Sequence, residues 1–165
     1  MSEREAEGYD ISAVEQWVLE GIPALTPPFK WERLEGGHSN LTYRLQDQSG
    51  KLAVIRRPPK GELLPKAHDM SREWVLISSL GVTGFPVPAA YGFCESKEVT
   101  GAWFYVMDHV EGRPLHNAQQ TLDWVPEDRR MALAYSLIDT LADLHVLNPD
   151  DIGLGELSKK EGYVA

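Results

Sequence analysis

Residues 36–57 combine a loop of small and polar residues with two strand-like runs, the second of which ends in two cations. Residues 36–40 have the sequence Gly-Gly-His-Ser-Asn, and residues 41–45 alternate apolar or aromatic with polar side chains. After a polar turn, residues 52–57 have the sequence Leu-Ala-Val-Ile-Arg-Arg. Small residues leave backbone amides accessible to an anion, and a rigid strand can present a positive side chain beside them. This combination suits the phosphates of a nucleotide triphosphate.

The same loop also has a purely structural explanation. Turns of Gly, Ser and Asn are common in β-hairpins, and composition alone favours the ordinary hairpin. The loop is not a Walker loop, because no Gly-Lys-Ser/Thr sequence follows it. A second glycine pair, Gly153 and Gly155, does not complete a dinucleotide-binding fingerprint, because Ser158 stands at the third position. A phosphate site therefore needs support from residues elsewhere in the chain.

Arg56 and Glu73 could supply that support. Side chains alternate along a strand, so Val54 and Arg56 share one face of the predicted sheet. Glu73 falls on a predicted helix, from which its carboxylate could hold Arg56 in place. Alternatively, Arg56 extends into solvent from the strand end, and Glu73 forms an ordinary surface ion pair.

Residues 104–112 have the sequence Phe-Tyr-Val-Met-Asp-His-Val-Glu-Gly, an apolar strand that runs out into a polar turn. Such a segment is typical of a hinge between two lobes. Backbone groups freed at the strand end could pair with the edge of a nucleotide base. The alternative is an edge strand that simply leaves its sheet, as in any antiparallel domain.

The overall composition limits the classes of protein to which these segments can belong. The chain has 165 residues, 42% of them hydrophobic, enough for one compact domain or one small lobe with part of another. Its formal net charge of −9 opposes binding to nucleic acid or to an anionic membrane surface. The segment from Arg44 to Lys66, however, contains six basic residues and only two acidic ones. This positive island suits a compact polyanion such as ATP, although chance clustering on a solvated edge explains it equally well.

The composition also indicates the cellular compartment in which the protein is found. One cysteine, Cys94, excludes an internal disulfide and a zinc site built from cysteines, and it fits a reducing environment. The longest apolar runs are too short to cross a bilayer, and residues 1–7 are charged rather than signal-like. These features predict a soluble, cytoplasmic protein.

The order of hydrophobic patterns predicts an α+β fold. A first helix is expected after the N-cap candidates Asp10 and Ser12, with Glu15 at capping-box spacing from Ser12 and Gly21 at the end. Three strands follow, then a helix over residues 67–80, then two more strands around a turn near Gly101 and a helix from residue 126. In this last helix, apolar residues at three- and four-residue spacing predict one buried stripe: Met131, Ala134, Leu137, Ile138, Leu141 and Leu144. The pattern predicts a five-stranded antiparallel sheet with one inserted helix, followed by a helical region.

Seven segments in this order and spacing resemble the aminoglycoside phosphotransferase/choline kinase family, the small-molecule relatives of protein kinases. The similarity is closest to the branch associated with acyl-CoA dehydrogenases. The matching segments are residues 36–43, 54–59, 64–68, 72–73, 85–88, 104–112 and 141–145. The resemblance implies a protein-kinase-like small lobe over residues 29–110, preceded by a helix and connector over 1–28. Residues 111–165 would form the hinge and the first helical part of a large lobe.

The resemblance also implies roles for individual residues around ATP. Gly37, Ser39 and Asn40 would lie in the loop over the phosphates. Arg56 would take the phosphate-facing position usually held by lysine, with Glu73 as its partner on the helix. Arginine keeps the positive charge and can donate to two oxygens at once.

On the other side of the nucleotide, the resemblance implies a pocket for adenine. Val54 would cover the ring, and Met107 would line the back of the pocket. The backbone carbonyl of Asp108 and the amide of Val110 would bind the adenine edge. Lys66 and His68 match the branch as well, but no role follows for them beyond lining the cleft.

One departure from the family pattern concerns catalysis. The family's base lies in a His-x-Asp-x-x-x-x-Asn motif, and a second Asp binds Mg²⁺. None of the five histidines begins this motif. We therefore expect no catalytic residue and no metal ligand in these 165 residues, and no activity of the chain alone.

The sequence thus predicts the ATP-binding half of a phosphotransferase that would transfer the γ-phosphoryl group to a hydroxyl of a small molecule, with Mg²⁺. The acceptor is not indicated. One alternative is a non-catalytic, kinase-like interaction module. Another is a structural fragment whose exposed apolar lobe face leads to self-association.

Overall fold

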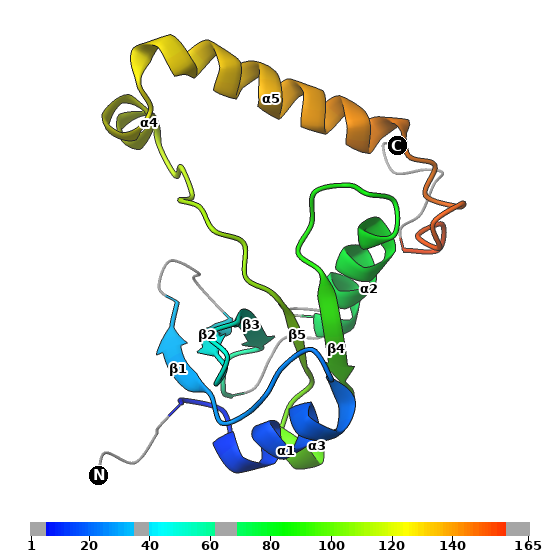
Figure 1. Cartoon of the computed structure of the whole chain (residues 1–165). Helices are drawn as coiled ribbons and strands as arrows, with labels where there is room; N and C mark the ends of the chain where they lie inside the picture. The colour runs from blue at the N-terminus through cyan, green and yellow to red at the C-terminus, as the bar shows by residue number, and fades with distance from the viewer. Residues whose placement is uncertain (1–5, 35–39, 62–68, 158–165) are drawn as a thin grey trace.

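The computed structural model describes residues 6–34, 40–61 and 69–157, which form a β-sheet with helices on both faces and a separate helical arm (Figure 1). The five strands form one antiparallel sheet in the order β1-β2-β3-β5-β4. The strands are β1 (Lys30–Arg33), β2 (Leu41–Gln46), β3 (Leu52–Arg57), β4 (Ala90–Cys94) and β5 (Phe104–Asp108). The helices are α1 (Ile11–Gly21), α2 (Met70–Gly81), α3 (Lys97–Thr100), α4 (Ala118–Trp124) and α5 (Glu127–Val146). The predicted α+β fold is confirmed.

Strands β2 and β3 form a hairpin whose turn is fixed by Asp47. One carboxylate oxygen of Asp47 accepts hydrogen bonds from the Ser49 amide (2.8 Å), the Ser49 hydroxyl (2.7 Å) and the Lys51 amide (2.9 Å). The other accepts from the Thr26 amide at 3.2 Å. Burial raises the pKa of Asp47, but these hydrogen bonds outweigh it and leave the pKa below its ordinary value. The turn therefore sets the register of β2 against β3.

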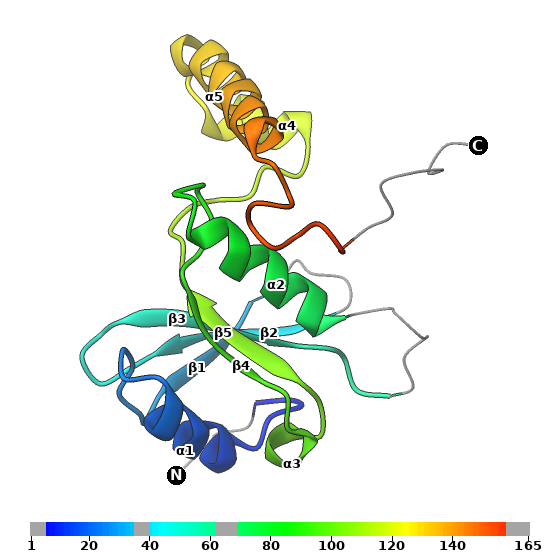
Figure 2. The ribbon, with the colours of Figure 1, turned by 90° about the vertical axis from the view of Figure 1, so that its right-hand side faces the viewer.

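Helix α1 covers one face of the sheet (Figure 2). Val14 and Val18 on α1 are fully buried in one core cluster with the side chains that β2, β3 and β5 direct to this face. Phe104 is also fully buried there, with its ring edge-on to Trp17 at 5.0 Å. Burial of this apolar surface supplies most of the stability of the sheet.

The start of α1 differs from the predicted capping box. Asp10 is the N-cap, and its side chain accepts a hydrogen bond from the Ala13 amide at 3.0 Å. Glu15 instead accepts from the Phe29 amide at 2.8 Å, and so ties the connector after α1 back to the helix. The capping box of Ser12 with Glu15 is therefore wrong, because Asp10 is the N-cap and Ser12 lies inside the helix.

Helix α2 lies on the opposite face of the sheet (Figure 2). Its N-cap is Asp69, which accepts from the amides of Ser71 and Arg72. Trp74 stacks on Phe93 of β4, with ring centroids 5.8 Å apart and planes 15° from parallel. The turn expected near Gly101 contains the helical turn α3, for which Gly101 is a left-handed C-cap with φ of +81°.

Helices α4 and α5 form an arm beyond β5, separated from the sheet by the extended residues 109–116 (Figure 1). The apolar stripe of α5 is present at the predicted positions but is exposed; Leu137 is 71% exposed and Ile138 is 59% exposed. The prediction of a buried stripe is therefore wrong for the described residues, because none of them covers this face. Helix α4 was not predicted. No helix of the described part combines the length and apolar character needed to cross a membrane.

Candidate functional site

An ion pair between β3 and α2 is the centre of the candidate site. Arg56 lies on the α2 side of β3, and Glu73 lies in the first turn of α2. The Arg56 Nε atom is 3.0 Å from Glu73 Oε2, and the two side chains are 35% and 32% exposed. The pair is partly shielded from solvent, yet open enough for a ligand to reach the guanidinium.

Two further side chains hold the Glu73 carboxylate. The Tyr105 hydroxyl donates to Glu73 Oε2 at 2.8 Å, and the Asn40 side-chain amide donates to Oε1 at 3.3 Å. The pKa of Tyr105 is raised by burial and further by Glu73, so its hydroxyl remains a donor at neutral pH. Glu73 is therefore fixed from β5, from the start of β2 and from β3 at once.

Tyr105 is the member of this network that the sequence analysis missed. It is the residue directly opposite Arg56 in the β3–β5 ladder, and it lies two residues before Met107 on the same strand face. Strand alternation from Met107 could have placed Tyr105 on that face. The pairing of β3 with β5, which are not consecutive in sequence, could not be read from the alternation.

The side chains expected around adenine lie on the same face of the sheet. Val54 is directly opposite Met107 in the β3–β5 ladder, and it precedes Arg56 by two residues. Val54 is buried and Met107 is half-buried. These two side chains therefore provide an apolar surface next to the polar Arg56 network.

The end of β5 is held by its own hydrogen bonds. The Asp108 amide donates to the Ala89 carbonyl at 2.8 Å, and its side chain accepts from the Tyr91 hydroxyl and the His109 amide, both at 3.0 Å. Val110 follows in the exposed segment and is 65% exposed. Its amide has no hydrogen-bond partner among the described residues.

The structure describes Asn40 of the expected phosphate loop. Gly37 and Ser39 lie outside the described residues, as do Lys66 and His68. The described part of the chain also contains no group of three or more His, Cys, Asp or Glu side chains suited to a metal ion. The described site thus consists of the Arg56 network and the Val54–Met107 surface.

Comparison with known families decides the class of this chain. The model of the phosphotransferase enzyme family matches residues 30–165, which include every strand and the helices α2 to α5. The chain belongs to the phosphotransferase enzyme family. The match begins at β1, so the matched residues include the described sheet and the arm.

Curated relatives of this phosphotransferase-family chain carry acyl-CoA dehydrogenase names. Acyl-CoA dehydrogenase family member 11 of Rattus norvegicus is 34% identical over 94% of the chain, which corresponds to 20% of that protein. The Homo sapiens protein of the same name is 38% identical over 77% of the chain and 16% of its own length. Probable acyl-CoA dehydrogenase IBR3 of Arabidopsis thaliana is 34% identical over 88% of the chain and 18% of its length. The chain spans about a fifth of these relatives, and the branch expected from the sequence is confirmed.

A solved structure confirms the kinase-like fold. It comes from Ralstonia eutropha JMP134 and is described as a candidate aminoglycoside phosphotransferase. The match has a TM-score of 0.72 and 29% sequence identity, and it covers 92% of this chain and 42% of the other. The fold and the family thus agree.

Proposed function

We propose that this chain is the ATP-binding part of a phosphotransferase that transfers the γ-phosphoryl group of ATP to a hydroxyl of a small molecule. The observation that carries the proposal is the Arg56–Glu73–Tyr105 network next to the Val54–Met107 surface on one face of the sheet. It offers a fixed positive charge beside an apolar platform. A nucleotide presents the complementary pair of a polyanion and a flat base.

The phosphate end depends on the guanidinium of Arg56. Its ion pair with Glu73 engages Nε, and the Nη groups are the donors that would meet phosphate oxygens. Because Glu73 is itself held by Tyr105 and Asn40, Arg56 is oriented before the nucleotide binds. Such pre-orientation lowers the entropic cost of binding. Gly37 and Ser39 would close over the same phosphates from the loop before β2.

The adenine end depends on the apolar surface one step along the strands. Two residues of a strand span about 7 Å, so Val54 lies at a distance from Arg56 that separates a base from its phosphates. Val54 would cover the ring and Met107 would line the back of the pocket. The Asp108 carbonyl would accept a hydrogen bond from the adenine edge, and the exposed Val110 amide would donate one to it.

The chemical step needs groups that this chain does not supply in the family's pattern. No His-x-Asp-x-x-x-x-Asn motif occurs in the 165 residues. When bound to the nucleotide, Mg²⁺ would neutralise charge on the phosphates. We therefore assign to this chain the binding and orientation of ATP, and assign no catalytic residue or metal ligand. The free, buried Cys94 and the acidic composition fit a protein of the cytoplasm that binds neither membrane nor nucleic acid.

The test is a calorimetric titration of the chain with ATP and Mg²⁺. Arg56→Ala should weaken binding about tenfold or more, since a charge-assisted contact to phosphate is lost. Lys30→Ala is the matched control, because it removes an exposed cation of edge strand β1 and should leave the affinity unchanged. Equal binding by wild type and Arg56→Ala, or binding by neither, would remove the nucleotide role from this chain.

The non-catalytic interaction module is the second candidate, and the exposed apolar stripe of α5 is the observation that favours it. Sedimentation of the chain distinguishes the two. A module of this kind would associate through α5 and show no ATP affinity. Substitution of Leu137 and Ile138 by Ser would then abolish this association.

A further inference from the structure

The positive island of the sequence does not lie on one side of the sheet. Arg56 lies on the α2 face, whereas Arg57, the next residue, lies on the α1 face. Arg44 forms an ion pair with Glu32 across β1 and β2. Arg57 and Lys60 are therefore cations of the island that the proposed ATP site does not use.

Arg57 is a buried cation whose contacts are backbone carbonyls. It is 6% exposed, and its Nη1 atom donates to the carbonyls of Gly8 and of Thr100, the latter at 2.7 Å. Its Nε atom donates to the Pro58 carbonyl at 3.1 Å. Among the described residues no carboxylate pairs with it, and burial lowers its pKa. A buried positive charge that meets only neutral dipoles is stabilised further by any anion that can approach it.

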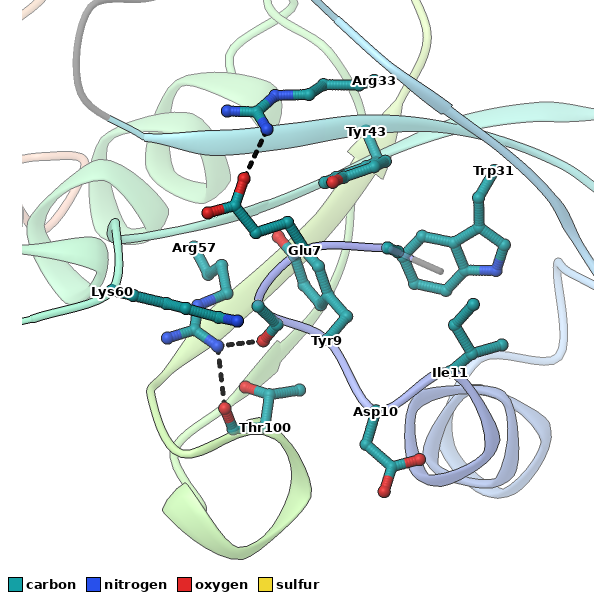
Figure 3. A pocket seen from close by; sticks show the side chains of 12 residues that line it. Glu7, Tyr9, Asp10, Ile11, Trp31, Arg33, Tyr43, Arg57, Lys60 and Thr100 are labelled. Atoms are coloured by element: carbon teal, nitrogen blue, oxygen red, sulfur yellow. Dashed lines mark hydrogen bonds and ion pairs between the residues drawn. The ribbon is translucent and has the colours of Figure 1, made fainter. Parts of the chain in front are cut away.

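An open cavity gives an anion that access. It has a volume of about 940 Å³ and lies between the segment before α1, strands β1 and β2, and the end of β3 (Figure 3). Its walls include the aromatic side chains of Tyr9, Trp31 and Tyr43. Arg57 and Lys60 line this cavity and also a neighbouring one of about 460 Å³, to which Lys97 contributes. The two cations therefore lie at the boundary between two openings.

The acidic residues of the cavity leave this positive charge uncompensated. Glu7 forms an ion pair with Arg33 at 2.5 Å, which offsets both charges at the rim. Asp10 caps α1 and lies beside that helix, away from the cationic ends of Arg57 and Lys60 (Figure 3). Lys60 is exposed and has no ion-pair partner within the described residues.

We infer that Arg57 and Lys60 form a second anion site, which binds the phosphate group of a small phosphate monoester on the α1 side of the sheet. The terminal guanidinium nitrogen of Arg57 and the Lys60 ammonium would donate to the phosphate oxygens. The organic part of the ligand would lie in the cavity against its aromatic wall. This inference is independent of the proposed ATP site, because it rests on the opposite face of the sheet and on different residues.

The test uses the full chain, with inorganic phosphate and phenyl phosphate as probes followed by amide chemical shifts in NMR titrations. Lys60→Ala should lower the affinity for both probes about tenfold, and Lys60→Glu should lower it further. Both variants should fold, since the Lys60 side chain is exposed and outside the core. Lys30→Ala should leave both affinities unchanged, and the probes should still shift the Tyr9 and Thr100 amides in Arg56→Ala. Phenyl phosphate should bind more tightly than inorganic phosphate, and shifts should occur at Tyr9 and Thr100.

Several results would overturn the inference. One is wild-type binding of neither probe at millimolar concentration, and another is unchanged binding in Lys60→Glu. Loss of binding in Arg56→Ala would assign the phosphate to the nucleotide site instead. Equal affinity for the two probes would exclude the aromatic wall as part of the site.

Discussion

Arg56 and Arg57 are neighbours on one strand, yet they belong to two different environments. Arg56 is about one-third exposed and forms an ion pair with Glu73 of α2. Arg57 is buried on the α1 side, where it donates to carbonyls from the N-terminal segment and from the end of α3. We call the α2 side, which carries the proposed ATP site, the recognition face, and the α1 side, where Arg57 ties these segments to the sheet, the cohesive face. A one-residue shift of register would exchange them.

The largest effect is expected from Arg57→Ala. The change leaves the buried carbonyl of Pro58 and the partly buried carbonyls of Gly8 and Thr100 without their donor, which should cost about 2–4 kcal/mol of unfolding free energy. Arg56→Ala removes a partly exposed ion pair and should cost about 1 kcal/mol or less. Urea unfolding of both variants measures the difference. Equal losses would show that the two faces are not distinct in stability.

Gly8→Ala tests the same cohesive face from its other side. Gly8 has φ of +88°, and a Cβ atom there would lie 2.5 Å from Leu41 Cδ1. We expect a loss of about 1–3 kcal/mol from backbone strain together with displacement of Leu41. Gly50→Ala is the control, since Gly50 has φ of +90° but no atom within 4 Å of the new Cβ. In thermal unfolding, the midpoint temperature of Gly8→Ala should lie clearly below that of Gly50→Ala. The reverse order would contradict close packing at Gly8.

Asp47→Asn tests the turn that sets the register. The side-chain amide cannot accept from all the donors that the carboxylate binds, so about 1–2 kcal/mol should be lost at pH 7. The folded pKa of Asp47 lies below its ordinary value, so this stabilisation is present above about pH 4 and lost as the pH falls through the folded pKa. Urea unfolding at pH 7, 5 and 3 should show the gap between wild type and variant closing. A gap as wide at pH 3 as at pH 7 would rule out the carboxylate as its source.

The smallest effect on stability is expected from Glu73→Gln on the recognition face. The ion pair is partly solvated, so the cost should stay below about 1 kcal/mol. ATP affinity should nevertheless fall about three- to tenfold, because Arg56 loses its orienting carboxylate. Calorimetry gives the affinity and urea unfolding the stability. A large loss of stability with unchanged ATP affinity would show that Glu73 has a structural role and does not orient Arg56 for ATP.

Local patterns predicted much of the fold and the recognition face. Alternation in residues 41–45 and 52–57 placed Arg56 and Val54 on one side, and a helix carrying Glu73 was expected at the right place. The Arg56–Glu73 pairing is present in the structure.

Contacts between segments distant in the sequence could not be predicted from local patterns. Two of the three acceptors of Arg57 lie 49 residues before it and 43 residues after it, and no periodicity connects them. Adjacent residues of a strand are close in sequence but point to opposite faces of the sheet, so the positive island of the sequence is divided between the two faces. Periodicity in α5 identified an apolar face, but it carries no information on what covers that face.

The stack of Trp74 on Phe93 has a practical consequence for spectroscopy. Trp74 directly follows Glu73 on α2, and its ring also lies 6.3 Å from that of Tyr105. Any tilt of α2 that changes the hold on Arg56 must alter the surroundings of this indole. The difference in fluorescence emission between wild type and Trp74→Phe would therefore report the position of α2 through intrinsic tryptophan fluorescence, without an added label.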